Sequence, residues 1–320
     1  DDKRTMIPLG VLVQRYQQVL DDAWQRGPAP FSVCSLTGAE RAKWAHAREH
    51  LLTLGNNKQA LHQVESGIFA MSLEPGVDVA DREVAVGALH GDGRSRWFDK
   101  SFTGVVKADG NLSIHIEHSW ADAPVPLDGW FNHAMPFAEQ QIAALKRGEP
   151  VASVRPGDDA KWPAPAEVKF ELDDAAKRAI RDTEKFLDDV IRDSSVEAVH
   201  CMGLGKAVWK QAGISPDAAV QMAMQVAFRR LHGGDVPVAT YETIGMAGWL
   251  HGRTECCRVV SNDSERFVQA MLNGYLRTRA EDDRVVAEKA LRAAADAHIK
   301  YISEGQQGKG VDRHLLGLRS

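Results

Sequence analysis

The segment Phe102–Pro124 reads FTGVVKADGNLSIHIEHSWADAP and contains the clearest β pattern in the chain. Two β-rich runs, Phe102–Lys107 and Leu112–His118, flank the turn dipeptide Asp109-Gly110, so the segment predicts a β-hairpin. His118 ends the second run and has the same parity as its apolar residues. We therefore expect this histidine at the end of a strand, on the buried side.

His118 and Asp122 stand four residues apart, and Pro124 favours a turn after them. A general base that acts on an alcohol needs a neutral imidazole held in one orientation, and a carboxylate folded back to the ring would provide that. On spacing alone, however, a strand-end histidine beside a surface aspartate is the simpler interpretation. His115 points to the opposite face of the strand, so the two histidines cannot chelate together.

The N-terminal third is expected to be helical. Thr37–Glu40 has the spacing of a capping box, and the helix after it would bury Trp44, Ala47 and Leu51. A second helix is expected over Gln59–Phe69, and its apolar spacing predicts burial of three residues. These are Leu61, Val64 and Ile68.

The second half begins after a segment rich in proline and alanine, Glu149–Glu167, which we interpret as an interdomain crossing. The expected domains are therefore residues 1–160 and 161–320. Alternating helices and strands, with a hairpin, favour a layered α/β architecture. We expect these further elements: a helix over Asp173–Arg192, a strand over Val196–Met202, a helix that starts at Ser215-Pro216-Asp217, and a helix over Glu281–Ser303.

Lys206 and Lys210 follow the glycine loop Gly203-Leu204-Gly205 and would share one helix face. That arrangement suits phosphate, although the P-loop pattern fails because no Ser or Thr follows Lys206. Taken alone, a solvated basic face is the more common explanation.

The overall composition excludes several classes of protein. The 320 residues include 39 Lys+Arg and 44 Asp+Glu, a net charge of −5 that gives no general attraction to nucleic acid. Four cysteines without C-x-x-C spacing argue against a zinc or disulfide framework. His46 and His50 lack a third ligand, so no metal is expected. We also expect neither a membrane-spanning helix nor a targeting segment within these residues.

Six ordered blocks of sequence, considered together, resemble the carnitine/choline acyltransferase family. The wording H-S-W-A-D-A-P is closest to its carnitine palmitoyltransferase branch. The blocks are Arg96–Ser101 with Ile116–Pro124, Gly205-Lys206, Ser215–Ala218, Thr240–Thr243, Gly252–Glu255 and Gly310–Leu318.

The resemblance implies the two-domain α/β fold of coenzyme A-dependent acyltransferases, which is similar to chloramphenicol acetyltransferase, with an active-site tunnel between the domains. Family members are longer, so we expect the 320 residues to be part of a longer chain. The S-T-S block of the family, which helps to hold the oxyanion and carnitine, would lie beyond Ser320.

The resemblance also implies roles for individual residues. His118 matches the catalytic base and Asp122 the acid that follows it, whereas Asp99 is expected to be structural. The coenzyme A contacts would be Lys206, Lys210, Ser215, Pro216, Asp217 and Thr243. The carnitine contacts would be Tyr241, Thr254 and Arg313, of which Arg313 would pair with the carnitine carboxylate. Two positions depart from the family pattern: Gln211 replaces a common lysine, and Thr243 replaces the usual serine.

The expected activity is a carnitine O-acyltransferase that moves a medium or long fatty acyl group reversibly between coenzyme A and the carnitine hydroxyl. Acyl-coenzyme A would be a co-substrate, with no permanently bound cofactor, and the resemblance implies a mitochondrial location. Two alternatives remain open at this point. One is an inactive fragment that still binds coenzyme A, and the other is an acyltransferase with another acceptor, such as choline.

Overall fold

The predicted hairpin is confirmed in the computed structural model, which describes residues 7–77, 79–149, 161–233, 236 and 238–319. Strand β2 (Phe102–Lys107) pairs antiparallel with β3 (Leu112–Ile116). Gly110 has a φ of +86°, in the left-handed region that glycine adopts without strain. The Lys107 N–H donates to the Asn111 carbonyl at 2.9 Å and closes the turn.

A third strand, β1 (Ala70–Glu74), pairs in parallel with the other edge of β2, so the sheet order is β1-β2-β3. The sequence did not reveal this strand, and the helix expected to reach Phe69 ends earlier. Helix α3 (Asn57–Ser66) buries Leu61 as predicted, but the side chain of Ile68 is 83% exposed. The helix ends at Ser66 and the chain then enters the sheet. The helical spacing of apolar residues therefore no longer predicts which side chains are buried beyond Gly67.

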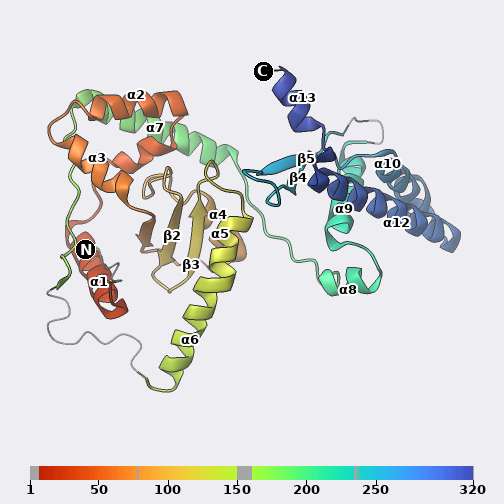
Figure 1. Ribbon diagram of the computed structural model, residues 1–320, viewed down its shortest axis with the longest axis horizontal. Coiled ribbons are helices and arrows are strands. Elements are labelled where there is room, and N and C mark those ends of the chain that lie inside the picture. The colour runs from red at the N-terminus through yellow and green to blue at the C-terminus, as the bar shows by residue number, and fades with distance from the viewer. Residues whose placement is uncertain (1–6, 78, 150–160, 234–235, 237, 320) are drawn as a thin grey trace. The chain divides into compact units, whose positions relative to one another are not determined.

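The described chain forms two compact units, residues 1–198 and 199–320. In the first unit, Figure 1 shows α2, α3 and α7 grouped together, beside the sheet that contains β2 and β3. The other elements of this unit are α1 (Leu9–Arg26), the 3₁₀ helix η1 (Val33–Gly38), α2 (Arg41–Leu51), α4 (Asp81–Leu89), α5 (Pro124–Gly129), the π-helical turn η2 (Trp130–Ala134), α6 (Met135–Lys146) and α7 (Asp174–Asp193).

The core of the first unit lies where η1, α2 and α7 meet. Trp44 packs edge-on against Trp97, with ring centroids 5.8 Å apart, and Ile180 of α7 is fully buried beside them. Burial of side chains of this size stabilises the fold by about 1.5–3 kcal/mol each. The helix predicted over 173–192 is thus confirmed, and the Asp173 carboxylate caps it by accepting from the Ala176 N–H.

The predicted capping box at Thr37 is wrong. Thr37 lies inside η1, and α2 begins only at Arg41. The buried Thr37 hydroxyl donates to the Cys34 carbonyl at 2.7 Å and accepts from the Phe98 N–H at 2.8 Å. The hydroxyl therefore fixes a distant loop instead of a helix end.

In the second unit, two helices begin as the sequence predicted. Ser215 caps α9 and Glu281 opens α12, and both helices pack on a two-stranded antiparallel sheet. The elements of this unit are α8 (Lys206–Gln211), α9 (Pro216–His232), β4 (Glu242–Gly245), β5 (Thr254–Cys257), α10 (Asn262–Gln269), the π-helical turn η4 (Ala270–Tyr275), α11 (Leu276–Thr278), α12 (Glu281–Glu304), the turn η5 (Gly305–Lys309) and α13 (Asp312–Arg319).

The strand predicted over 196–202 is wrong. This segment has no regular secondary structure, and the side chains of Val199 and Met202 are more than four-fifths exposed. Its alternating pattern finds no partner strand in the described residues. The centre of the expected interdomain crossing, 150–160, lies outside the described residues, and α7 packs against η1 and α2 of the first unit. Among the helices of the described ranges, none is both long enough and apolar enough to cross a bilayer.

Candidate active site

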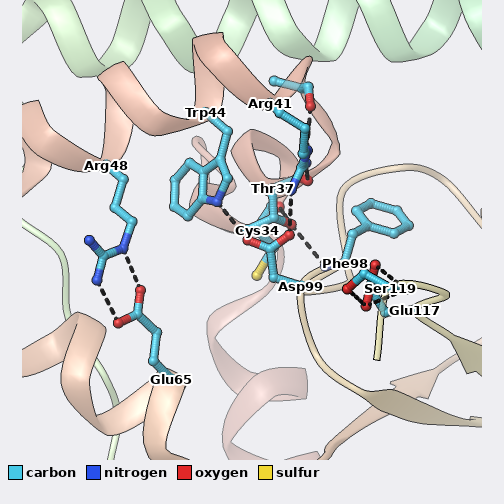
Figure 2. Close-up of polar contacts among 11 residues, drawn as sticks. Cys34, Thr37, Arg41, Trp44, Arg48, Glu65, Phe98, Asp99, Glu117 and Ser119 are labelled. Atoms are coloured by element: carbon cyan, nitrogen blue, oxygen red, sulfur yellow. Dashed lines mark hydrogen bonds and ion pairs between the residues drawn. The ribbon is translucent and has the colours of Figure 1, made fainter. Parts of the chain in front are cut away.

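Beyond the end of β3 the chain forms the 117–122 loop, which is fixed by side-chain hydrogen bonds. The Ser119 N–H and hydroxyl donate to the Glu117 carboxylate, at 3.0 and 2.6 Å (Figure 2). Trp120 Nε1 donates to the Ser101 carbonyl at 2.8 Å and ties the loop to the start of β2. Burial raises the pKa of Glu117, but the hydrogen bonds from Ser119 outweigh it and hold the pKa below its usual range. The carboxylate is therefore charged and holds the loop in shape at neutral pH.

His118 lies in this loop with its Nδ1 directed at the main chain. Nδ1 is 3.1 Å from the Ala121 carbonyl oxygen and 3.7 Å from Asp122 Oδ1. A carbonyl only accepts, so this hydrogen bond places the proton on Nδ1 and leaves the lone pair on Nε2. That is the form of imidazole that a general base requires. The carbonyl supplies the hydrogen bond that orients the ring, and Asp122 supplies a nearby negative charge.

The predicted burial of His118 is wrong, because 78% of its side chain is exposed. Strand β3 ends at Ile116, so the alternation of the strand no longer sets the direction of the histidine two residues later. His115, which lies within the strand, points to the other face as predicted, and its Nδ1 donates to the Ala88 carbonyl.

Asp99 has the structural role that the sequence suggested. Its carboxylate accepts from Trp44 Nε1 at 2.6 Å and from Arg41 Nη1 at 2.7 Å (Figure 2). Because Trp44 belongs to the core, these bonds anchor the segment before β2 to helix α2. Asp99 thus holds the base of the hairpin that carries the 117–122 loop.

In the second unit, Lys206 and Lys210 lie one turn apart on α8, and both side chains are exposed. Among the described residues, neither ammonium group forms an ion pair. Helix α8 has only six residues, so the two lysine charges, and not the helix end, would attract an anion. The arrangement is compatible with phosphate binding and with a solvated basic face.

The predicted coenzyme A contacts at the start of α9 have partners within the protein. Ser215 Oγ accepts from the Ala218 N–H, and Asp217 Oδ2 lies 2.9 Å from His298 Nε2. Pro216 occupies the first turn, where its missing N–H costs no hydrogen bond. These residues therefore shape the helix start, and the Asp217 side chain remains half exposed.

The β4–β5 sheet divides its residues between two faces. Thr243 and Gly245 lie on one face of the sheet. Thr254 pairs with Gly245 across the two strands and therefore lies on the same face. Tyr241, which directly precedes β4, has the same parity, and its hydroxyl lies 3.1 Å from Thr243 Oγ1. The three predicted substrate contacts on this sheet therefore share one face.

Arg313 and Thr254 are brought together by the packing of α13 against β5. Arg313 Nη2 lies 3.3 Å from Thr254 Oγ1, and Nε lies 3.4 Å from the Thr254 carbonyl. The Arg313 N–H also donates to Glu255, which is buried. Two predicted carnitine contacts thus stand side by side, with the guanidinium exposed.

His298 of α12 is a buried titratable residue that sequence reasoning missed. Only 2% of its side chain is exposed, and it contacts Asp217 and Glu242. The signal was present in the helix pattern, since His298 shares the buried stripe with Ala294 and Ala295. A histidine on an apolar face requires buried polar partners, which only the fold identifies.

Glu242, Cys257 and His298 also have donor atoms within 4.8 Å of one another, a spacing that a metal ion could use. Burial raises the pKa of Cys257 to about 11, with added repulsion from Glu242 and Asp217. The sulfur is therefore a neutral thiol at physiological pH and a poor ligand until a metal displaces its proton. Cys256 is buried as well.

Comparisons with known proteins match nearly the whole chain. The family model described as Choline/Carnitine o-acyltransferase matches residues 1–320. The chain is 33% identical over 295 residues to human "Carnitine O-palmitoyltransferase 2, mitochondrial", and the match covers 91% of this chain and 42% of that protein. It is 29% identical over 314 residues to the rat "Carnitine O-palmitoyltransferase 1, muscle isoform", and this match covers 96% of this chain and 39% of that protein.

The chain therefore spans about two-fifths of the length of these relatives. The match extends over the whole chain and includes both units, with the 117–122 loop in the first and the β4–β5 sheet in the second. The chain belongs to the choline/carnitine O-acyltransferase family.

Proposed function

We propose that the chain carries the catalytic machinery of a carnitine O-acyltransferase that transfers fatty acyl groups reversibly between coenzyme A and carnitine. The observation that carries the proposal is the state of His118, whose Nδ1 donates to the Ala121 carbonyl and whose Nε2 holds the lone pair. The names of both relatives support a long acyl chain, and the name of the human relative supports a mitochondrial location. The two-domain arrangement and the tunnel expected from the family are part of the same proposal.

In the proposed reaction, His118 Nε2 removes the proton of the carnitine hydroxyl. The alkoxide oxygen attacks the thioester carbonyl carbon, and the tetrahedral intermediate collapses with cleavage of the C–S bond. The imidazolium returns its proton to the leaving thiolate, so the enzyme ends in its starting state. General acid–base help of this kind accelerates a reaction by about 10²–10⁴-fold.

The remaining residues would hold the two substrates. Lys206 and Lys210 would meet the phosphate groups of coenzyme A as point charges. Arg313 and Thr254 would meet the carnitine carboxylate, for which a guanidinium offers two parallel donors. Choline has no carboxylate, so this pair of residues favours carnitine as the acceptor. No permanently bound cofactor has a part in the scheme.

The test is release of free thiol from palmitoyl-coenzyme A in the presence of carnitine or choline. His118→Ala should abolish the carnitine-dependent rate and leave coenzyme A binding nearly intact. His46→Ala, an exposed histidine on α2, is the matched control and should retain the wild-type rate. A His118→Ala rate within a few-fold of wild type would refute the assignment, and equal rates with choline would refute carnitine as the preferred acceptor.

A further inference from the structure

His298 lies where three elements of the second unit meet, and it contacts two carboxylates at once. Its Nε2 is 2.9 Å from Asp217 Oδ2 of α9 and 3.3 Å from Glu242 Oε2 of β4. Its Nδ1 faces Cys257 Sγ of β5 at 3.9 Å. Because the thiol is neutral, the two carboxylates are the charged groups that face the ring in the described structure.

The two carboxylates belong to elements with different predicted tasks. Asp217 stands in the first turn of α9, directly after Ser215 and Pro216 on the coenzyme A side. Glu242 stands between Tyr241 and Thr243, on the opposite face of β4. One imidazole therefore connects the helix start assigned to coenzyme A with β4, which directly follows the predicted carnitine contact Tyr241 and pairs with the strand of Thr254.

The electrostatics of this cluster show why a bridging donor matters. Burial and the neighbouring Asp217 raise the pKa of Glu242, and His298 partly offsets this rise. Glu242 Oε2 is inaccessible to solvent and lies 3.3 Å from His298 Nε2, and the Glu242 side chain also meets Asp217 and Gln221 of α9. Without the imidazole, the two carboxyl groups would lose the donor that they share, and their mutual repulsion in this partly dehydrated region would no longer be offset.

We propose that His298 is a positioning residue that joins the coenzyme A contacts to the carnitine contacts. It holds the start of α9 at a fixed place relative to β4 through Asp217 and Glu242. The inference rests on the proposed function for the identity of the two substrates. The bridge itself rests on the distances and on the near-complete burial of the imidazole.

The first experiment uses two substitutions of His298 in the full chain. His298→Leu has a similar volume but no donor, and should raise the KM for palmitoyl-coenzyme A and the KM for carnitine together, each about tenfold. The kcat should change by less than threefold, because His298 touches no reacting atom. His298→Gln restores an N–H donor and should return both KM values to within about threefold of wild type.

His232→Leu supplies the same substitution at an exposed histidine of α9 and should leave both KM values unchanged. The inference is wrong if His298→Leu leaves both KM values unaltered or raises only one of them. It is also wrong if His298→Gln behaves like His298→Leu, because a packing defect would not be rescued by a donor.

A second variant keeps the test decisive if His298→Leu does not fold. Asp217→Ala lies at the helix start assigned to coenzyme A, yet it should weaken carnitine binding about fivefold in calorimetry, since His298 then loses one of its two partners. Unchanged carnitine affinity would overturn the bridge. This readout needs no turnover, so an absence of carnitine-dependent thiol release by the wild-type chain would refute the proposed function separately.

Discussion

The substitution Asp122→Asn separates the two groups that could orient the imidazole of His118, the proposed general base. It keeps the size of the side chain and removes its charge. In the structure His118 Nδ1 donates to the Ala121 carbonyl at 3.1 Å, whereas Asp122 Oδ1 is 3.7 Å away, beyond hydrogen-bond distance. The main-chain acceptor survives the substitution, so the tautomer that leaves Nε2 as the base should survive too.

The size of the effect follows from the charge–charge distance. Two unit charges 3.7 Å apart interact by about 1 kcal/mol when the medium is water-like. The His118 ring is 78% exposed, so the water-like limit applies better than a buried one. A loss of about 1 kcal/mol in stabilisation of the imidazolium in the transition state corresponds to a roughly fivefold lower kcat.

The assay is steady-state thiol release from palmitoyl-coenzyme A at saturating carnitine, with His118→Ala beside it. We expect Asp122→Asn to lose about fivefold in kcat with little change in either KM, and His118→Ala to lose at least a hundredfold. A loss of a thousandfold or more for Asp122→Asn would show that the carboxylate, and not the carbonyl, sets the tautomer. Our interpretation of the loop geometry would then be wrong.

Three further predictions concern binding and stability. Replacing both Lys206 and Lys210 by Ala should raise the coenzyme A KM and flatten its dependence on salt, and an unchanged KM would return them to a solvated surface role. Arg313→Asn should raise the carnitine KM about tenfold or more, since a hydrogen bond to a charged group contributes about 1.5–3 kcal/mol; the ratio of kcat/KM for carnitine to kcat/KM for choline should fall. Burial raises the pKa of Glu74, but hydrogen bonds from Lys107 and Arg96 outweigh it and lower the pKa overall. The Glu74 carboxylate therefore stabilises the fold fully at a pH above its pKa in the unfolded chain. This contribution is lost as the pH falls through the lowered pKa of the folded protein. Glu74→Gln should therefore cost about 3–5 kcal/mol in the free energy of unfolding at pH 7, and flatten its acid dependence, in urea titrations at several pH values.

The sequence predicted those elements whose signals are local. The β2–β3 turn, the helix α7 that starts after Asp173 and the start of α9 at Ser215 depend on local signals, and all three are confirmed. Strand β1 escaped prediction because its stability comes from pairing with β2, about 30 residues later in the sequence. The capping box at Thr37 was wrongly predicted for the same reason, because the Thr37 hydroxyl accepts from the N–H of Phe98, 61 positions away in the sequence.

The candidate site divides in a similar way. The motif around His118 pointed to the proposed base, but the choice between a carbonyl and a carboxylate as its orienting partner depends on how the 117–122 loop closes. The burial of His118 was inferred from strand parity, which holds only while the strand lasts. His298 needed the fold itself, because its partners are 81 and 56 positions away in the sequence.

The division of β4 and β5 into two faces makes the sheet sensitive to a shift in alignment. Thr243 and Thr254 lie on one side, while Glu242 and Cys257 are held against α12 on the other. Deleting one residue in the turn before β4 would leave the faces intact, whereas deleting one inside β4 would exchange them for every position beyond the deletion. Hydroxyl groups would then enter the interior and a core side chain would reach solvent. Substitutions at the proposed acceptor contacts Tyr241 and Thr254 would therefore leave the two faces of the sheet intact, and insertions or deletions within these strands would not.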